Sequence, residues 1–159
     1  MLNNILILIA LTLLPFLELR ASIPYGVFNT DLHWLYIFII CVITNIILAP
    51  IIYLLFDKIV FIATRIKMID GLYKSYIERT QKRISKYVNK YGVLGVALFI
   101  GIPLPGSGVY SGAVGAHLVG IDFKKFIIAS IIGVLIAGIL VTIICLTGNG
   151  LFSFFIKRI

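Results

Sequence analysis

The chain has 159 residues, of which 61% are hydrophobic, and its mean hydropathy is +1.13. Soluble domains average about 45–50% apolar residues, so the composition excludes an ordinary soluble fold and indicates an all-α integral membrane protein. The net charge is +8. In a membrane protein this charge indicates basic cytoplasmic loops and contact with anionic membrane lipids, and we expect no nucleic-acid partner. The length allows one membrane domain, residues 1–159.

The first hydrophobic segment, Ile5–Leu17, is short for a membrane span and runs into charged residues. A spanning helix needs about 17–25 apolar residues, whereas Pro15, Glu18 and Arg20 end this segment early. No basic region precedes it and no small-residue cleavage site follows it, so we expect it to stay in the mature protein.

Two arrangements of this segment remain open. It either crosses the membrane completely, or it enters, turns at Ser22–Gly26 and returns through Val27–Leu32 as a re-entrant hairpin. We prefer the hairpin, because Pro24 and Gly26 both weaken a helix.

The first full-length span is predicted at Leu35–Phe56, with Asn45 turned towards protein, and the next segment, Asp57–Tyr91, is rich in Lys and Arg. The positive-inside rule places that segment in the cytoplasm. Its apolar and aromatic residues recur at helical spacing, which predicts an amphipathic helix on the inner membrane surface. Such a helix is either a regulatory, lipid-sensing element or a plain anchored linker, and the linker is the simpler interpretation.

The second hydrophobic block, Gly92–Gly120, is interrupted at Gly101-Ile-Pro-Leu-Pro-Gly-Ser-Gly108. Two prolines and two glycines lie in the interruption: Pro103, Pro105, Gly106 and Gly108. Proline cannot continue a helix, so an apolar helix through Val93–Ile100 has to end here and a second helix can begin after Gly108. In hydrocarbon a broken backbone is tolerated only where protein or a wet cavity covers it, so the break predicts a second hairpin and a site.

The last full span is predicted at Phe126–Thr147, ended by Gly148-Asn-Gly150. Each half then consists of a re-entrant hairpin and a transmembrane helix. We predict two inverted repeats, 1–56 and 92–147, joined by the cytoplasmic amphipathic linker 57–91 and followed by a tail, 148–159. Both termini are predicted to lie outside. A full crossing at Gly92–Gly120 satisfies the charge rule equally well, and the Pro-Leu-Pro-Gly sequence decides for the hairpin.

Glu18 and Arg20 lie inside the N-terminal apolar block, and charges at membrane depth usually face the protein interior and serve function. Helices are predicted to restart at mid-membrane after Pro24–Gly26 and after Pro105–Gly108. Helix N-termini favour anions, and Arg20 adds a planar cation. The sequence therefore predicts a site for a carboxylate or phosphate, in which Glu18 also caps N–H groups of the opposite tip.

The expected substrate-binding residues come from both breaks and the first span: Glu18, Arg20, Pro24, Tyr25, Gly26, Asn45, Pro103, Pro105, Gly106, Ser107, Gly108, Tyr110 and Ser111. The sequence carries no nucleophilic triad, metal cluster or phosphate loop. We therefore expect no enzyme activity, no cofactor and no metal. The two cysteines, Cys41 and Cys145, are expected to be small buried residues.

The paired motifs Glu18-Leu-Arg-Ala-Ser-Ile-Pro-Tyr-Gly26 and Gly101-Ile-Pro-Leu-Pro-Gly-Ser-Gly108, with Ser111-Gly112, resemble those of the bacterial and archaeal small multi-drug export protein family. That family is distantly similar to the DedA/VTT membrane proteins, which are thought to have two facing re-entrant hairpins and to move lipid carriers such as undecaprenyl phosphate. The resemblance implies that Glu18 and Arg20 match the charged positions of their first hairpin. It also implies that three residues match the second tip: Pro103, Pro105 and Gly106.

The breaks and the resemblance together predict a small secondary transporter of the prokaryotic inner membrane, crossing it several times. The expected substrate is anionic or amphipathic, for example a lipid phosphate such as undecaprenyl phosphate, and Glu18 is expected to link transport to protons. The alternative is a non-transporting membrane scaffold or partner subunit. A homo-oligomer, at least a dimer, is expected because so short a chain can hardly cover two polar tips, with Gly133 and Gly138 as contacts.

Overall fold

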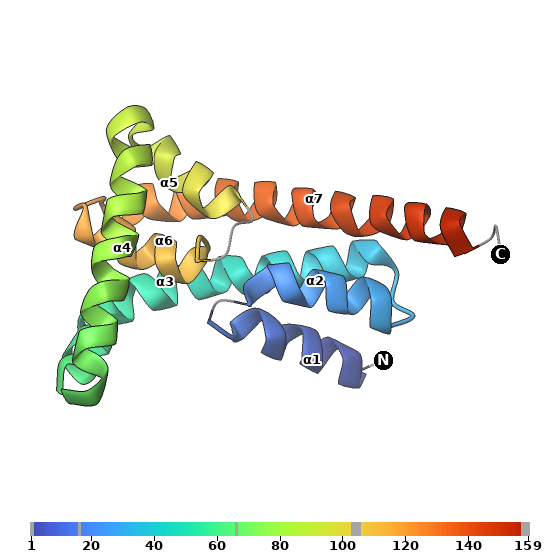
Figure 1. The fold of residues 1–159 in the computed structure, drawn as a ribbon, viewed down its shortest axis with the longest axis horizontal. Coiled ribbons are helices and arrows are strands. Elements are labelled where there is room, and N and C mark those ends of the chain that lie inside the picture. Colours follow the sequence, from blue (N-terminus) through green and yellow to red (C-terminus); the bar gives the residue numbers. More distant parts are fainter. Residues whose placement is uncertain (1, 16, 66, 103–105, 157–159) are drawn as a thin grey trace.

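The computed structural model describes residues 2–15, 17–65, 67–102 and 106–156, without the side chains of 56–74, 76–77, 89 and 149–156. Across these residues the ordered elements are all helices, as the composition predicts. Seven helices are described (Figure 1): α1 Leu2–Leu13, α2 Glu18–Asn29, α3 Trp34–Arg65, α4 Lys67–Tyr91, α5 Val93–Gly101, α6 Val109–Leu118 and α7 Phe123–Ile156.

The helices form two hairpins beside two long helices. α1 and α2 pack antiparallel and precede α3, while α5 and α6 pack together and precede α7 (Figure 1). α3 and α7 run side by side along the bundle, and α4 crosses their ends at a steep angle. The start of α1 and the end of α7 lie at the end of the molecule away from α4 (Figure 1).

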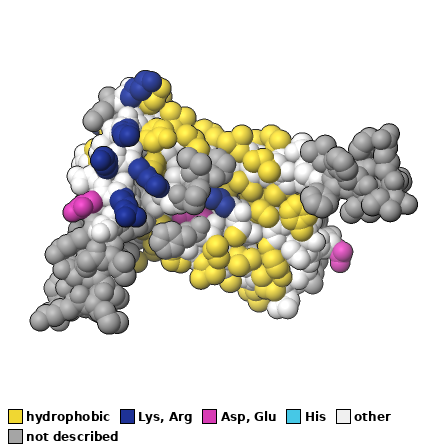
Figure 2. Space-filling model, in the orientation of Figure 1, with side chains coloured by type: hydrophobic (Ala, Val, Ile, Leu, Met, Phe, Trp, Pro, Cys, Tyr) yellow, Lys and Arg dark blue, Asp and Glu magenta, His cyan; other side chains and the backbone are white. Residues whose placement is uncertain are grey.

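Two helices are long and apolar enough to cross a membrane, Trp34–Leu55 and Phe123–Gly148. They match the spans predicted from the sequence to within a few residues at each end. Large apolar side chains on both remain exposed, including Leu54 and Ile144, and hydrophobic surface covers much of the middle of the molecule (Figure 2). Soluble monomers rarely expose so much contiguous apolar surface, so this belt is suited to lipid.

Both long helices extend beyond their predicted ends. α3 continues past Phe56 to Arg65, and α7 continues through Gly148-Asn-Gly150 to Ile156. The predicted stop at Gly148–Gly150 is therefore wrong. A glycine inside a helix costs only about 1 kcal/mol relative to alanine, and it ends a helix only where the backbone turns left-handed.

The first hairpin turns earlier than the sequence predicts. Its turn lies between α1 and α2, around Pro15, and the expected turn Ser22–Gly26 is helical and belongs to α2. α2 tolerates Pro24 because it packs against α1, α3 and α7. Gly26 serves this packing, since a Cβ there would lie 2.6 Å from Cγ2 of Ile37 on α3.

The glycines expected at a dimer contact lie inside the chain instead. A Cβ at Gly133 would lie 2.7 Å from the Ala97 carbonyl oxygen of α5, and one at Gly138 would lie 2.9 Å from Phe38 and Val42 of α3. Both glycines are buried and allow α7 to approach its neighbours closely. Their predicted role between subunits is therefore wrong, and oligomerisation stays a prediction.

Candidate functional site

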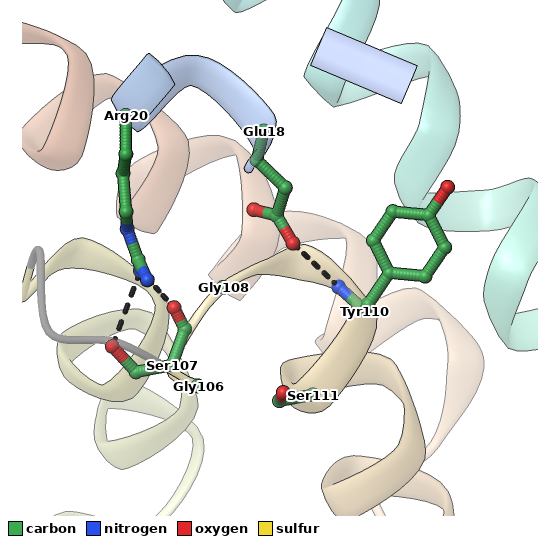
Figure 3. Close-up of a pocket in the computed structure, with 7 residues that line it drawn as sticks. All are labelled: Glu18, Arg20, Gly106, Ser107, Gly108, Tyr110 and Ser111. Atoms are coloured by element: carbon green, nitrogen blue, oxygen red, sulfur yellow. Dashed lines mark hydrogen bonds between the residues drawn. The ribbon is translucent and has the colours of Figure 1, made fainter. Parts of the chain in front are cut away.

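The tips of the two hairpins meet in the middle of the molecule. Glu18 and Arg20, from the first turn of α2, point towards the loop between α5 and α6 (Figure 3). Seven residues line a small pocket there: Glu18, Arg20, Gly106, Ser107, Gly108, Tyr110 and Ser111. Its volume of about 10 Å³ is near that needed for one water molecule. All seven are among the residues named from the sequence, and the contact is closed.

Glu18 caps the N-terminus of α6 from across the interface. Its carboxylate accepts hydrogen bonds from the backbone N–H of Val109 (3.0 Å, Oε2) and from that of Tyr110 (3.2 Å, Oε1), the second of which is drawn in Figure 3. These are the first two N–H groups of α6, which has no side-chain cap of its own at Gly108. The carboxylate thus pairs with unsatisfied donors at the positive end of a helix, and only 5% of Glu18 is exposed.

The absence of a side chain at Gly108 leaves room for the Glu18 carboxylate. A Cβ at Gly108 would lie 2.6 Å from Oε1 and 2.7 Å from Cδ of Glu18, distances too short for non-bonded atoms. The backbone of Gly108 is extended, with φ of −178°, so any residue could adopt it. The requirement at this position is therefore space for the Glu18 carboxylate.

The backbone of Glu18 is itself unusual. Its φ is +48°, in the left-handed region that non-glycine residues seldom adopt, which costs on the order of 1–3 kcal/mol. A chain of hydrogen bonds holds it there: Ser22 donates to the Glu18 carbonyl (3.2 Å), and the Thr12 hydroxyl lies 2.7 Å from that of Ser22. Thr12 and Ser22, both buried, are not among the site residues expected from the sequence, where two small hydroxyls in apolar helices give little signal.

Arg20 binds the other side of the same loop. Its guanidinium donates to the carbonyl of Ser107 and to the hydroxyl of Ser107 (3.1 Å), as Figure 3 shows. It also donates to the carbonyl of Ile102 (3.4 Å). The Ser107 hydroxyl in turn donates to the Ile102 carbonyl (2.7 Å). Ile102 caps the C-terminus of α5, so the guanidinium lies where a helix favours a cation.

The two charges of α2 therefore match the two ends of the broken helix. The carboxylate lies at the N-terminus of α6, and the guanidinium lies at the C-terminus of α5. A third link joins the hairpins, since the Tyr110 hydroxyl donates to the carbonyl of Leu13 at the end of α1 (2.6 Å). The tips satisfy one another's polar groups, but the first tip lies before α2 and not at the predicted break Ser22–Gly26.

Four of the remaining predicted residues, Pro24, Tyr25, Gly26 and Asn45, are not among those that line the pocket. Pro24, Tyr25 and Gly26 are within α2, so the helix restart expected after Gly26 is wrong; α2 begins at Glu18. Asn45 is buried on α3, as predicted, and its side-chain oxygen accepts no hydrogen bond from the described residues. Pro103 and Pro105 lie outside the described residues.

Neither a disulfide nor a metal cluster is present among the described residues. Cys41 and Cys145 are buried free thiols, as expected. Among the described residues, no three His, Cys, Asp or Glu side chains gather in a way that could hold a metal ion.

Two apolar helices of spanning length, with a buried carboxylate and a half-buried guanidinium between two hairpin tips, are typical of integral membrane proteins. Residues 18–140 match the family described as "Putative small multi-drug export protein", and the chain belongs to this family. Membership indicates a membrane transporter. No curated protein and no solved structure gives a match, and similarity to DedA/VTT proteins stays a prediction.

Proposed function

We propose that the protein is a secondary transporter of the prokaryotic inner membrane. In this proposal α3 and α7 cross the bilayer, and α1–α2 and α5–α6 enter it from opposite sides as re-entrant hairpins of two inverted repeats. Family membership and the two apolar helices support a transporter. The polar contact between the tips supports the hairpins, because unpaired backbone groups cost several kcal/mol each in lipid and Glu18 and Arg20 pair with such groups here.

The substrate class follows from the group that occupies the site. A carboxylate, that of Glu18, lies on the N-terminal N–H groups of α6, and this observation carries the proposal. Carboxylates and phosphates share that preference for helix N-termini, and Arg20 supplies a cation nearby. We infer an anionic or amphipathic substrate, for example a lipid phosphate such as undecaprenyl phosphate, which competes with Glu18 for these N–H groups.

Proton linkage follows from this competition. Protonation removes the negative charge of Glu18 and weakens its bonds to the N–H groups of Val109 and Tyr110, since charge-assisted hydrogen bonds are roughly twice as strong as neutral ones. The anion then takes the place of the carboxylate, and one proton is taken up for each anion bound. Because the pocket has room for about one water molecule, the tips have to separate for the substrate to enter.

Transport of a short-chain fluorescent polyprenyl phosphate across proteoliposomes tests this function. In the wild type we expect the rate to fall as pH rises, because the ionised Glu18 carboxylate holds the N–H groups that the anion needs. Glu18→Gln should lose this part of the pH dependence, because its side chain is always neutral, and keep only the part that comes from the phosphate of the probe itself. Asp31→Asn, at an exposed acid in the loop before α3, is the matched control and should behave as the wild type.

Two outcomes contradict the proposal. If Glu18→Gln keeps the pH profile of the wild type, Glu18 is not the proton-linked group. If wild-type proteoliposomes move the probe no faster than protein-free liposomes, the lipid-phosphate substrate is wrong. Failure of other anionic and amphipathic probes as well would favour the alternative of a non-transporting scaffold.

A further inference from the structure

The helix α4 is an integral part of the bundle. Ile84 on its inner face is completely buried, and its Cδ1 atom lies 2.8 Å from where a Cβ on Gly115 of α6 would be. A Cβ on Gly95 of α5 would lie 2.7 Å from the backbone nitrogen of Val88. Glycines on both arms of the second hairpin thus let α4 lie against their backbones, which a loosely anchored linker would not need.

The outer face of α4 is strongly basic. Five exposed side chains carry positive charge: Arg79, Lys82, Arg83, Lys86 and Lys90. Several are four residues apart, where like charges destabilise a helix by about 0.2–0.5 kcal/mol per pair. Glu78 is the one acidic side chain among those of α4 that the structure describes. Helix faces exposed only to water commonly alternate the sign of their charges, so this face is suited to an anionic partner.

A groove on this face offers donors for a phosphate. It is lined by Glu78, Gln81, Lys82, Ser85 and Lys86. Lys82 and Lys86 are one helical turn apart, and a hydroxyl and an amide lie beside them. The groove thus combines two cations with the donor amide of Gln81, and a single acid lies at its edge. The Ser85 hydroxyl lines the groove but donates to the Gln81 carbonyl (2.6 Å).

The position of α4 indicates where the phosphate comes from. α4 crosses the ends of the two membrane-length helices (Figure 1), and Lys and Arg side chains gather over it directly beside the hydrophobic surface (Figure 2). A phospholipid with its headgroup at α4 could lay its acyl chains along that apolar belt. A soluble phosphate has no acyl chains and would leave the belt uncovered. We propose that the groove on α4 binds the phosphate of an anionic phospholipid from the leaflet at that end of the molecule.

The lipid site adjoins the contact between the hairpin tips. Arg83 follows Lys82 in α4, and its Nη1 atom lies 3.4 Å from where a Cβ on Gly106 would be. Gly106 lines the tip pocket together with Ser107. The basic face of α4 thus contacts both the membrane surface and the loop that Arg20 holds. The lipid site requires no transport activity and stands independently of the proposed function.

Native mass spectrometry of the delipidated, detergent-solubilised protein titrated with phosphatidylglycerol or phosphatidylcholine tests the proposal. We expect one phosphatidylglycerol to be retained, and Lys82→Gln/Lys86→Gln to weaken its binding roughly 25-fold, at about 1 kcal/mol for each lysine near a membrane surface. Lys82→Arg/Lys86→Arg should retain the lipid. Lys124→Gln/Lys125→Gln removes the same charge from exposed lysines at the start of α7 and should also retain it.

Each of the following results would overturn the proposal. If Lys82→Gln/Lys86→Gln and Lys124→Gln/Lys125→Gln weakened phosphatidylglycerol binding equally, the lipid would be held by diffuse attraction to positive charge and not by a site on α4. Equal binding of phosphatidylcholine, or displacement by glycerol phosphate at the concentration of the lipid, would exclude an anionic lipid as the occupant. Amine labelling of the wild type in nanodiscs gives a second measurement that needs no variant: phosphatidylglycerol should protect Lys82 and Lys86 relative to phosphatidylcholine, and unchanged labelling would contradict the site.

Discussion

Replacing Gly108 by alanine should displace the Glu18 carboxylate from the N-terminus of α6, although it adds a single methyl group. The methyl carbon would occupy the place of the carboxylate, 2.6 Å from its Oε1 atom. Two charge-assisted hydrogen bonds would be lost, each worth about 1.5–3 kcal/mol. We expect the free energy of unfolding to fall by about 3 kcal/mol, measured by denaturation in detergent, and transport of the polyprenyl phosphate probe to lose the part of its pH dependence that comes from Glu18.

Two further variants separate this effect from a general effect of glycine substitution. Gly148→Ala, in α7, meets no atom within 4 Å and should leave stability unchanged or raise it by up to about 1 kcal/mol. Adding Glu18→Asp to Gly108→Ala shortens the carboxylate side chain by one methylene and should restore part of the lost stability. If Gly108→Ala matched the wild type in both stability and pH profile, the capping role of Glu18 would be wrong.

Arg20→Ala should reduce both stability and transport, because the Arg20 side chain holds both ends of the loop between α5 and α6. The buried carbonyl of Ser107 would lose its Arg20 donor, and a buried group left unpaired costs about 1–3 kcal/mol. The Ile102 carbonyl would lose the guanidinium but keep its hydrogen bond from the Ser107 hydroxyl. We expect a loss of about 1–3 kcal/mol in the free energy of unfolding and of most transport of the lipid-phosphate probe in proteoliposomes.

Conservative and distant substitutions give the controls for Arg20. Arg20→Lys keeps the charge, but its side chain is one atom shorter than the path to Nη2, the nitrogen that reaches the carbonyls of Ile102 and Ser107, so it should fall between alanine and the wild type. Arg79→Ala, at an exposed arginine on α4, should leave stability and transport near the wild-type values. Unchanged folding and transport in Arg20→Ala would instead favour a scaffold.

The broken second hairpin and its pairing with Glu18 could be predicted from the sequence because the signals are local. The prolines of 101–108 cannot continue a helix, the glycines beside them weaken it, and unpaired backbone in an apolar setting needs a polar partner. Glu18 and Arg20 are the charged residues inside the first apolar block and so are the expected partners. The sequence does not show that Glu18 and Arg20 divide between the ends of α5 and α6, because that depends on how α2 is rotated.

The errors arose where packing outweighs local preference. Pro24 and Gly26 weaken a helix in isolation, yet α2 continues through them because neighbouring helices cover it. Gly148 was read as a stop, yet α7 continues. Gly133 looked like a contact between subunits, but whether a small residue faces a second copy or α5 depends on tertiary structure. Asn45 was correctly expected to be buried, but the sequence could not show that it lies outside the pocket lining.

Infrared difference spectroscopy of the wild type and Glu18→Gln, recorded as the polyprenyl phosphate probe is added, tests most directly the claim that an anionic substrate and the Glu18 carboxylate compete for the N-terminus of α6. The account predicts that a protonated-carboxyl band appears on binding in the wild type and is absent from Glu18→Gln. Binding of the probe to the wild type with no such band, or with the same band in Glu18→Gln, would contradict it.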